Sequence, residues 1–494
     1  MKKRFITFAL GLISLGSWAQ VAPAPYGALP SERQLKWHET EVYGLIHFTP
    51  TTFENKEWGY GDANPSIFNP ILFNADSIVA AMKAGGLKGL VLVAKHHDGF
   101  ALWPTKTTRY NISRSPFREG KGDMVREFEQ ACRKAGLKFG VYCSPWDRNH
   151  PDYGTYEYVK AYREQLRELY THYGELFMSW HDGANGGDGY YGGARTTRKI
   201  DRNTYYAWDT TWQITRSLQP MANLFSDIGW DVRWVGNESG YADERSWATF
   251  TPTPASGESK AFPGNLQHEF NPMGTKGGAN WVPAECDVPL RNGWFWHPEQ
   301  ATQVKSPEQL FQLYLKSVGR GAALDLGLAP NTRGRLSPED IESLMGFGQL
   351  VGKTFDKNLM NSASISASNE RGNNFSVTSL TDGSNSTYWA SEDAVHRADF
   401  LIEWQEPQSI DFIRLREYIP LGQRIENVRV DQWNGNSWES VASASTVGAC
   451  RIIAMEKTLL SKKIRVSIEA PVTLTLSELG CYTKFKPSPK SNLP

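Results

Sequence analysis

The chain has 494 residues, of which 40% are hydrophobic and 21% charged, with 53 lysines and arginines against 53 aspartates and glutamates. This length predicts two to four domains. The composition and balanced charge exclude a disordered chain and give no basic excess for binding nucleic acid. Five scattered cysteines exclude a disulfide scaffold. The 18 tryptophans suit either a packed core or stacking against sugars.

The first nineteen residues have the pattern of a secretory signal peptide. Lys2, Lys3 and Arg4 precede an apolar stretch, Phe5–Leu15, and Ser17–Ala19 provides a small-x-small cleavage site. The stretch is too short for a membrane span, and no later run approaches 18 apolar residues. We therefore expect an exported protein, periplasmic or extracellular, with no membrane span.

Residues 20–354 form the first expected domain, in which short apolar runs alternate with longer helical patterns. Such alternation predicts βαβ units with parallel strands. About eight strands favour an α/β fold of the (β/α)8 TIM-barrel type, with a doubly wound sheet as the alternative. The expected strands are 43–48, 89–94, 138–143, 176–180, 223–226, 232–235, 281–284 and 322–326; the expected helices are 77–83, capped by Asp76, and 123–135, 156–173, 203–218 and 306–318.

After Thr354 the pattern changes to short strands separated by Asn- and Ser-rich turns. This predicts a C-terminal β-sandwich of the jelly-roll type over 355–483, followed by a disordered tail over 484–494. The segments LTDGSNSTYW, FLIEW and LSELGCY resemble discoidin-like modules, which implies either glycan binding or a purely structural role. The expected strands are 400–404, 411–416, 428–433, 438–442, 463–468 and 474–482.

Polar and aromatic side chains gather where the expected barrel strands end. In a barrel of this type, the carboxyl ends of the strands and the loops after them form the site. A carboxylate directly after an apolar strand, as at Asp182, suits acid–base or nucleophilic chemistry. The histidines lack a compact ligand spacing such as HExxH, so we expect no metal. The candidates are His47, Lys95–Asp98, Tyr142, Trp146, Asp147, Trp180, His181, Asp182, Asn237, Glu238, Glu285 and Asp287.

A glycine-rich segment, Gly187–Gly192, matches the GxGxxG pattern of dinucleotide-binding folds. No helix opens directly from it, and it follows the fourth strand rather than the first. We therefore expect a flexible loop over a pocket, with Tyr190 and Tyr191 as candidates for stacking against a ligand. No cofactor is expected.

Six segments resemble, in the same order, the α-L-fucosidases of glycoside hydrolase family 29. They are HFTPTTF…EWG, KHHDGF.LWPT, GVYCSPWD, W.DGANGG, DVRWVGNE.G and WVPAE.DV…GWFWH. The resemblance covers roughly residues 30–350. The likeness is greatest to the branch of the family that prefers branched α-1,3 and α-1,4 linkages.

The resemblance implies retaining hydrolysis of terminal α-L-fucosides on an oligosaccharide or glycoconjugate of the Lewis type. Asp182 matches the nucleophile of the family and Glu238 its general acid/base, with Glu285 as the alternative for the second role. Retaining enzymes hold two such carboxyl groups about 5–5.5 Å apart, one ionised and one protonated. The substrate pocket carries over as His47, Glu57, Trp58, His96, His97, Tyr142, Trp180 and Trp294.

One position departs from the family pattern. His181 lies between Trp180 and Asp182, where an apolar aromatic residue is expected, so it either alters the ionisation of Asp182 or faces the barrel wall. Two further hypotheses stay open: a catalytically silent barrel that binds glycans, and a glycosidase of altered specificity, for example toward α-galactosides. No feature of the sequence indicates an oligomeric state.

Overall fold

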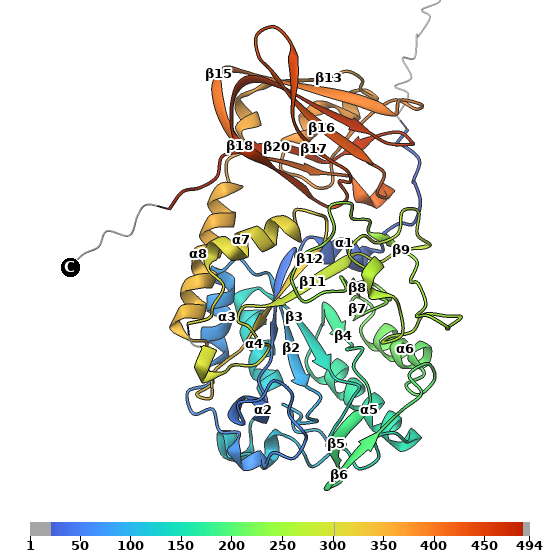
Figure 1. The fold of residues 1–494 in the computed structure, drawn as a ribbon, viewed down its shortest axis with the longest axis vertical. Coiled ribbons are helices and arrows are strands. Elements are labelled where there is room, and N and C mark those ends of the chain that lie inside the picture. Colours follow the sequence, from blue (N-terminus) through green and yellow to red (C-terminus); the bar gives the residue numbers. More distant parts are fainter. Residues whose placement is uncertain (1–20, 301, 488–494) are drawn as a thin grey trace, which may run out of the picture.

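A closed barrel of parallel strands forms the larger part of the computed structural model, which describes residues 21–300 and 302–487 (Figure 1). Within these ranges eight strands pair in the order β1-β12-β11-β8-β7-β4-β3-β2. Because β1 pairs with β12 as well as with β2, the sheet closes. The expected barrel is confirmed, and the doubly wound alternative is wrong. The strands are β1 (Val42–Ile46), β2 (Gly89–Lys95), β3 (Lys138–Cys143), β4 (Met178–Trp180), β7 (Asn223–Ser226), β8 (Val232–Trp234), β11 (Ala284–Pro289) and β12 (Ala323–Leu328).

The longer helices pack around the outside of this barrel (Figure 1). Local sequence sets their ends: the Asp123 side chain accepts the backbone N–H of Arg126 at the start of α4, and Gly136, at φ 74°, ends that helix. Helix α3 is capped by Asn74 and not by Asp76 as expected, so it begins earlier. The helices are α1 (Glu32–His38), α2 (Pro50–Phe53), α3 (Ala75–Ala84), α4 (Met124–Ala135), α5 (Tyr156–His172), α6 (Trp208–Leu218), α7 (Pro307–Lys316) and α8 (Pro338–Thr354).

Several elements of the barrel differ from the sequence expectation: α1 was not expected, and α6 begins at Trp208 rather than at residue 203. The seventh strand is not 281–284, because Trp281 belongs to β10 (Asn280–Trp281), which pairs with β9 (Thr249–Phe250) in a separate sheet. The barrel strand starts only at Ala284, which places Glu285 and Asp287 inside it. Helix α8 was not expected, although Ser337 and Pro338 carry an N-terminal signal.

The glycine-rich segment is a β-hairpin, so the prediction of a flexible loop is wrong. Strand β5 (Gly187–Tyr191) pairs in continuous antiparallel register with β6 (Ala194–Arg198). Tyr191 is buried, its ring stacks on that of Tyr153, and its hydroxyl accepts from Trp146 Nε1 at 3.0 Å. Tyr191 is therefore not free to stack against a ligand, whereas Tyr190 is half-buried.

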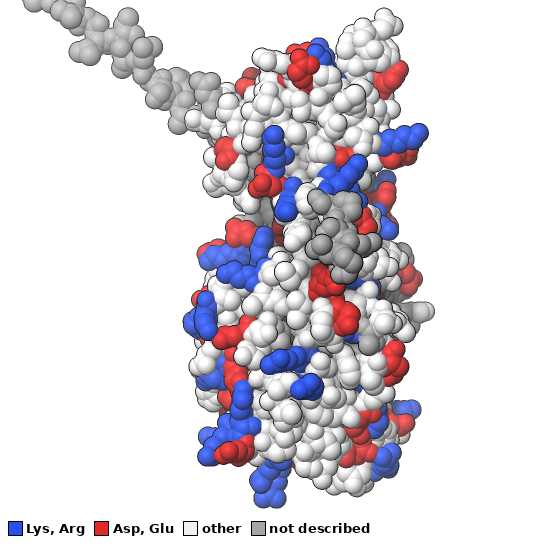
Figure 2. Space-filling view, turned by 90° about the vertical axis from the view of Figure 1, so that its left-hand side faces the viewer, with Lys and Arg blue, Asp and Glu red and all other residues white. Residues whose placement is uncertain are grey.

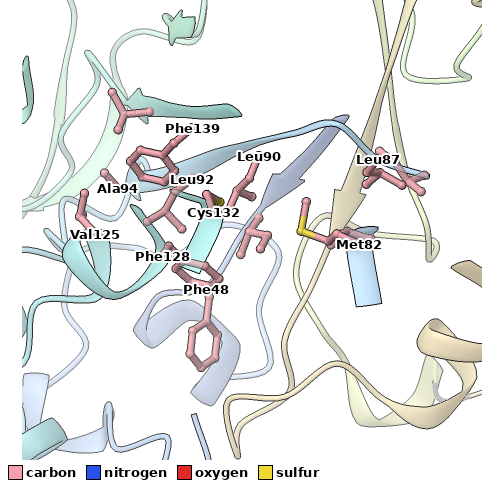
Figure 3. Close-up of a cluster of buried hydrophobic side chains, with 14 of the residues drawn as sticks. Phe48, Met82, Leu87, Leu90, Leu92, Ala94, Val125, Phe128, Cys132 and Phe139 are labelled. Atoms are coloured by element: carbon pink, nitrogen blue, oxygen red, sulfur yellow. The ribbon is translucent and has the colours of Figure 1, made fainter. Parts of the chain in front are cut away.

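The main hydrophobic core lies between the barrel strands and the surrounding helices. Figure 3 shows part of it, where Phe48, Leu90 and Leu92 approach Phe128 of α4. A second cluster, including Tyr43, Tyr142 and Trp180, fills the barrel interior. All five cysteines are buried free thiols.

The C-terminal region is built from antiparallel sheets, as expected. Strands β15 and β18 are long and continuous where shorter strands were expected, and bulges interrupt their register. The core packs between the larger sheet and the small β14–β19 sheet. The larger sheet contains β13 (Ser364–Ala367), β15 (Arg397–Arg416), β16 (Asn427–Trp433), β17 (Trp438–Ala444), β18 (Arg451–Glu469) and β20 (Glu478–Tyr482); the smaller contains β14 (Trp389–Ala390) and β19 (Thr475–Leu476).

This region packs on the end of the barrel opposite α2 and the β5–β6 hairpin (Figure 1). Arg416 joins the two parts by donating to Glu41 at 2.6 Å, directly before β1, and to Glu478 at 3.0 Å. Gln423 exchanges hydrogen bonds with the backbone of Ser246 and Ala248. The amino ends of the barrel strands are thus covered, and their carboxyl ends are left open to form a site.

The two ends of the chain lie largely outside the described residues. The expected signal peptide, 1–19, falls there entirely. Of the expected disordered tail, Lys484 pairs with Glu308 and the Phe485 N–H donates to Thr354 Oγ1 at 3.1 Å, so the start of the tail is held on the barrel. No helix of the described ranges is long and apolar enough to cross a membrane. On the face shown in Figure 2, acidic and basic side chains are interspersed.

Packing of α4 against the barrel should be sensitive to truncation at Phe128, which is fully buried. Replacing it by alanine leaves a cavity, so we expect Phe128→Ala to lower the free energy of unfolding by about 3–5 kcal/mol. The matched control is Gln130→Ala, an exposed position of the same helix. Chemical denaturation that gives equal stabilities for the two variants would contradict this packing.

Candidate active site

A cavity of about 490 Å³ opens at the carboxyl ends of the barrel strands. It is lined by all ten residues that the family resemblance assigns as nucleophile, acid/base or substrate pocket: His47, Glu57, Trp58, His96, His97, Tyr142, Trp180, Asp182, Glu238 and Trp294. They come from the ends of six strands, β1, β2, β3, β4, β8 and β11, or from the loops that follow them. The other candidates Lys95, Asp98, Trp146, Asp147, His181, Asn237 and Glu285 do not line it. Asp287, a candidate from the sequence, also lines the cavity, as do Asn292, His297 and Gln300, which the sequence did not single out.

Asp182 lies at the end of β4 and is held at both carboxyl oxygens. Its Oδ1 accepts the backbone N–H of Ala184 at 2.7 Å, and its Oδ2 accepts the hydroxyl of Tyr142 at 2.8 Å. Burial raises the pKa of Asp182, while both hydrogen bonds favour the charged form and oppose that rise. The Tyr142 ring in turn packs on Trp180, with ring centres 4.8 Å apart. The carboxylate is therefore fixed in one orientation.

His97 presents a hydrogen-bond acceptor to the cavity. Its Nδ1 lies 2.7 Å from Ser144 Oγ, and the Ser144 hydroxyl itself donates to the carbonyl oxygen of Trp146. Nδ1 must therefore carry the ring proton, which leaves a lone pair on Nε2, 3.7 Å from Asp182 Oδ2. Burial lowers the pKa of His97 to about 3, so the ring is neutral at pH 7. Two acceptors side by side suit a ligand hydroxyl.

His47 and His96 are also buried and neutral, because burial holds the pKa of each well below its ordinary value. Their ring centres lie 5.3 Å apart, and His96 is 4.1 Å from His97. The Nδ1 atoms of His47 and His96 have no hydrogen-bond partner among the described residues. Since a buried polar atom without a partner is costly, these imidazoles are suited to bind a polar, uncharged ligand.

Glu57 joins two loops at the rim of the cavity. Its Oε1 accepts the backbone N–H of Trp294, and its Oε2 lies 3.4 Å from the N atom of Phe295 and 2.8 Å from His297 Nε2. The other ring nitrogen of His297 lies 2.8 Å from Asn55 Oδ1. Glu57 was predicted only as a ligand-binding residue, and the structure shows that it also positions the loop that carries Trp294.

Two glycines make room for this arrangement. A Cβ atom on Gly293 would lie 2.5 Å from Glu57 Oε2, and one on Gly327 in β12 would lie 2.6 Å from the Trp294 ring. The indole of Trp294 can therefore reach His47, with ring centres 5.2 Å apart.

Glu238 lies in the loop after β8, on the rim of the cavity. Although its side chain is exposed, partial burial of the carboxyl group raises its pKa, and the negative charges of Asp182 and Glu57 raise it further. A hydrogen bond with the Trp294 side chain acts in the opposite direction. The carboxyl group of Glu238 thus keeps its proton to a higher pH than a free glutamate does.

Glu285 occupies a different place from Glu238. It is fully buried inside the barrel below the cavity, where it accepts from Trp180 Nε1 at 2.8 Å and from the hydroxyl of Tyr43. Burial raises its pKa to about 7. It does not line the cavity, so it orients Trp180 from below. Asp287, two residues on, does line the cavity and accepts from Trp234 Nε1 at 2.6 Å.

His181 faces the barrel wall, which is one of the two orientations expected from the sequence. Its ring nitrogens lie 3.0 Å from the Tyr162 hydroxyl and from Ser179 Oγ, and it packs against Trp208 of α6. Burial lowers its pKa to about 3, and the ring does not contribute to the pKa of Asp182.

Two other carboxylates lie near the mouth without lining the cavity. Asp147, a candidate from the sequence, is buried as the partner of Lys95 at 3.1 Å. Asp227 was missed, although it directly follows β7; its Oδ2 accepts from the Gly264 N–H, and burial raises its pKa to about 7. Among the described residues no group of three or more His, Cys, Asp or Glu side chains could hold a metal ion.

The cavity thus combines four carboxyl groups, Asp182 and Glu238 among them, with neutral imidazoles and tryptophans, and a pair of carboxyl groups of this kind is typical of glycoside hydrolases. The family model described as alpha-L-fucosidase matches residues 18–354. The chain is 37% identical to alpha-L-fucosidase 1 of Arabidopsis thaliana, over 95% of this chain and 90% of that protein. The chain therefore belongs to the α-L-fucosidase family, and it is a glycoside hydrolase.

Solved structures share the architecture along almost the whole chain. A glycoside hydrolase 29 family member from an unknown rumen bacterium matches with a TM-score of 0.82 and 35% identity, covering 95% of this chain and 79% of its own. A Ruminococcus gnavus GH29 fucosidase solved in complex with fucose matches with a TM-score of 0.82 and 27% identity, covering 94% and 97%.

The contact between Gly293 and Glu57 can be tested by adding one methyl group. Because the new Cβ would displace the Glu57 carboxylate and with it the Trp294 loop, we expect Gly293→Ala to lower kcat/KM on an aryl α-L-fucoside by about 10²-fold. Gly352→Ala, at an exposed site of α8 with open space around it, is the control and should be active. Unchanged kinetics of Gly293→Ala would show that Glu57 does not depend on this packing.

Proposed function

We propose that the enzyme is a retaining exo-α-L-fucosidase that releases terminal α-1,3- or α-1,4-linked fucose from branched glycans of the Lewis type. The observation that carries this proposal is that the carboxyl groups of Asp182 and Glu238 line the same cavity. The hydrogen bonds to Asp182 favour an anion, whereas the surroundings of Glu238 favour the protonated acid. These are the two states that a double displacement requires.

In the first step an oxygen of Asp182 attacks the anomeric carbon of fucose as the bond to the leaving oxygen breaks, and Glu238 gives its proton to that oxygen. In the second step Glu238 takes a proton from water, the water oxygen bonds to the anomeric carbon, and the bond to Asp182 breaks. Tyr142 assists both steps by holding Asp182 in position.

Recognition of the sugar follows from the rest of the cavity. Neutral acceptors on His97 and the unpaired ring nitrogens of His47 and His96 match the ring hydroxyls of an uncharged sugar. Indole rings of Trp180 and Trp294 provide apolar surface for the C5 methyl group, and Trp58, 50% exposed, lies at the rim for the neighbouring sugar. The Ruminococcus gnavus enzyme solved with fucose supports this choice of ligand. Neither the silent barrel nor α-galactoside specificity has an observation in its favour.

The preference for branched linkages is proposed from the resemblance of the six segments, taken together, to that branch of the family. Export to the periplasm or the outside is proposed from the pattern of residues 1–19.

The roles of Asp182 and Glu238 can be distinguished with two substrates that differ in their leaving group. Asp182→Ala should abolish release of fucose from both an aryl α-L-fucoside and a Lewis x trisaccharide. Glu238→Ala should slow the trisaccharide by about 10²–10⁴-fold and the aryl fucoside much less, because an aryl leaving group needs no proton. Equal losses on both substrates would assign the acid role to another residue, and NMR of the first product should show the α anomer.

The pH profile offers an independent check. The Tyr142 hydroxyl lowers the pKa of Asp182, so Tyr142→Phe should raise that pKa and move the acid limb of kcat/KM to higher pH. Trp294 lowers the pKa of Glu238, so Trp294→Phe should instead move the basic limb to higher pH. Each variant serves as the control for the other. If Tyr142→Phe moved the basic limb and Trp294→Phe the acid limb, the roles of Asp182 and Glu238 would be reversed.

A further inference from the structure

A second large groove, of about 670 Å³, lies between the barrel and the C-terminal sheet. One wall is the loop after β8, at Asp243–Arg245, and the floor is the outer face of β16, β17 and β18. This groove is separate from the active-site cavity, since the two have no lining residue in common.

The floor of the groove is the polar face of the sheet. Arg429 on β16 lies in register with Ser443 on β17 and with Ser467 on β18. Val428 and Val430, on either side of Arg429, point the other way into the core. Further along the same face Trp433 pairs directly with Trp438, their ring centres 5.4 Å apart. The aromatic pair does not line the groove, but it lies on the same face of the sheet as Arg429.

One side chain in the floor has a polar group that is free to bind a ligand. Ser467 is 3% exposed and lines the groove, yet its hydroxyl has no hydrogen-bond partner among the described residues. A buried hydroxyl without a partner costs free energy that a bound polar molecule would recover.

The charges around the groove select the kind of ligand. Three arginines and three carboxylates line it, so their charges balance. Several already pair with one another or with neighbours, as Arg397 does with Glu469 at 3.3 Å and Arg429 with Asp431 at 2.6 Å. No net charge is left to hold an anion or a cation. Hydroxyl and amide groups beside an aromatic pair suit a neutral sugar chain.

The groove is within reach of the active site. Asp243 is five residues after Glu238, so their Cα atoms are at most about 19 Å apart. Ser239 and Tyr241 between them are exposed. A glycan that places its terminal fucose in the cavity can therefore extend along this loop.

We propose that this groove is an exosite that binds a neutral, remote part of the glycan whose terminal fucose occupies the active site. The inference rests on the proposed function, since it takes the substrate to be a fucosylated glycan. The exosite would raise kcat/KM for large substrates and leave small ones unaffected.

The test compares three probes: an aryl α-L-fucoside, a Lewis x trisaccharide, and Lewis x carried on a desialylated N-glycan of a glycoprotein. We expect the unmodified enzyme to favour the glycoprotein, and Ser467→Val and Arg429→Ala each to lower kcat/KM on it by about 5-fold, the effect of one lost hydrogen bond. Activity on the two small probes should not change. The matched control is Ser366→Val, on the exposed face of β13 at the other edge of the sheet.

The outcomes are distinguishable. The exosite would be overturned if both groove variants kept the kcat/KM of the unmodified enzyme on the glycoprotein while their activity on the small probes was intact. Failure of the unmodified enzyme to release fucose from any probe would overturn the proposed function instead. If Ser467→Val unfolds at a lower temperature than the unmodified enzyme, Arg429→Ala decides, because that side chain is exposed and lies outside the core.

Discussion

Pairing of β1 with both of its neighbours, β2 and β12, is the constraint on which the site depends. Closure of a parallel sheet brings every strand's carboxyl end to one mouth. His47 and Trp294 are far apart in the chain, yet closure places their rings 5.2 Å apart. The C-terminal region contacts Glu41 before β1 and so covers the opposite end. The barrel therefore has one open end for a ligand.

Burial also determines which groups in this cavity carry a charge. The three histidines are neutral because burial disfavours their charged form, whereas Asp182 is supported as an anion by Tyr142 and Ala184. Negative charge at Asp182 in turn helps to keep Glu238 protonated. An uncharged sugar thus meets a pocket whose few charges are concentrated where bonds are made and broken.

Most of the barrel and the predicted site residues could be found from the sequence, because strand ends and motifs are local signals. The orientation of the His181 side chain could not be predicted from the sequence. It depends on Tyr162 and Trp208, which lie in helices that no sequence pattern places opposite it. Nor could the link between Glu57 and Trp294, which joins loops from different strands. The seventh strand was misplaced because the apolar run at Trp281 pairs with β9 outside the barrel.

The five free thiols have a consequence for where the protein can work. Burial raises the pKa of the Cys143 and Cys132 thiols to about 12, so neither forms the reactive thiolate at ordinary pH. No disulfide holds the fold together, since every cysteine is reduced. The molecule needs no oxidant to mature and loses no crosslink to a reductant. Reducing conditions therefore break no crosslink in the described fold.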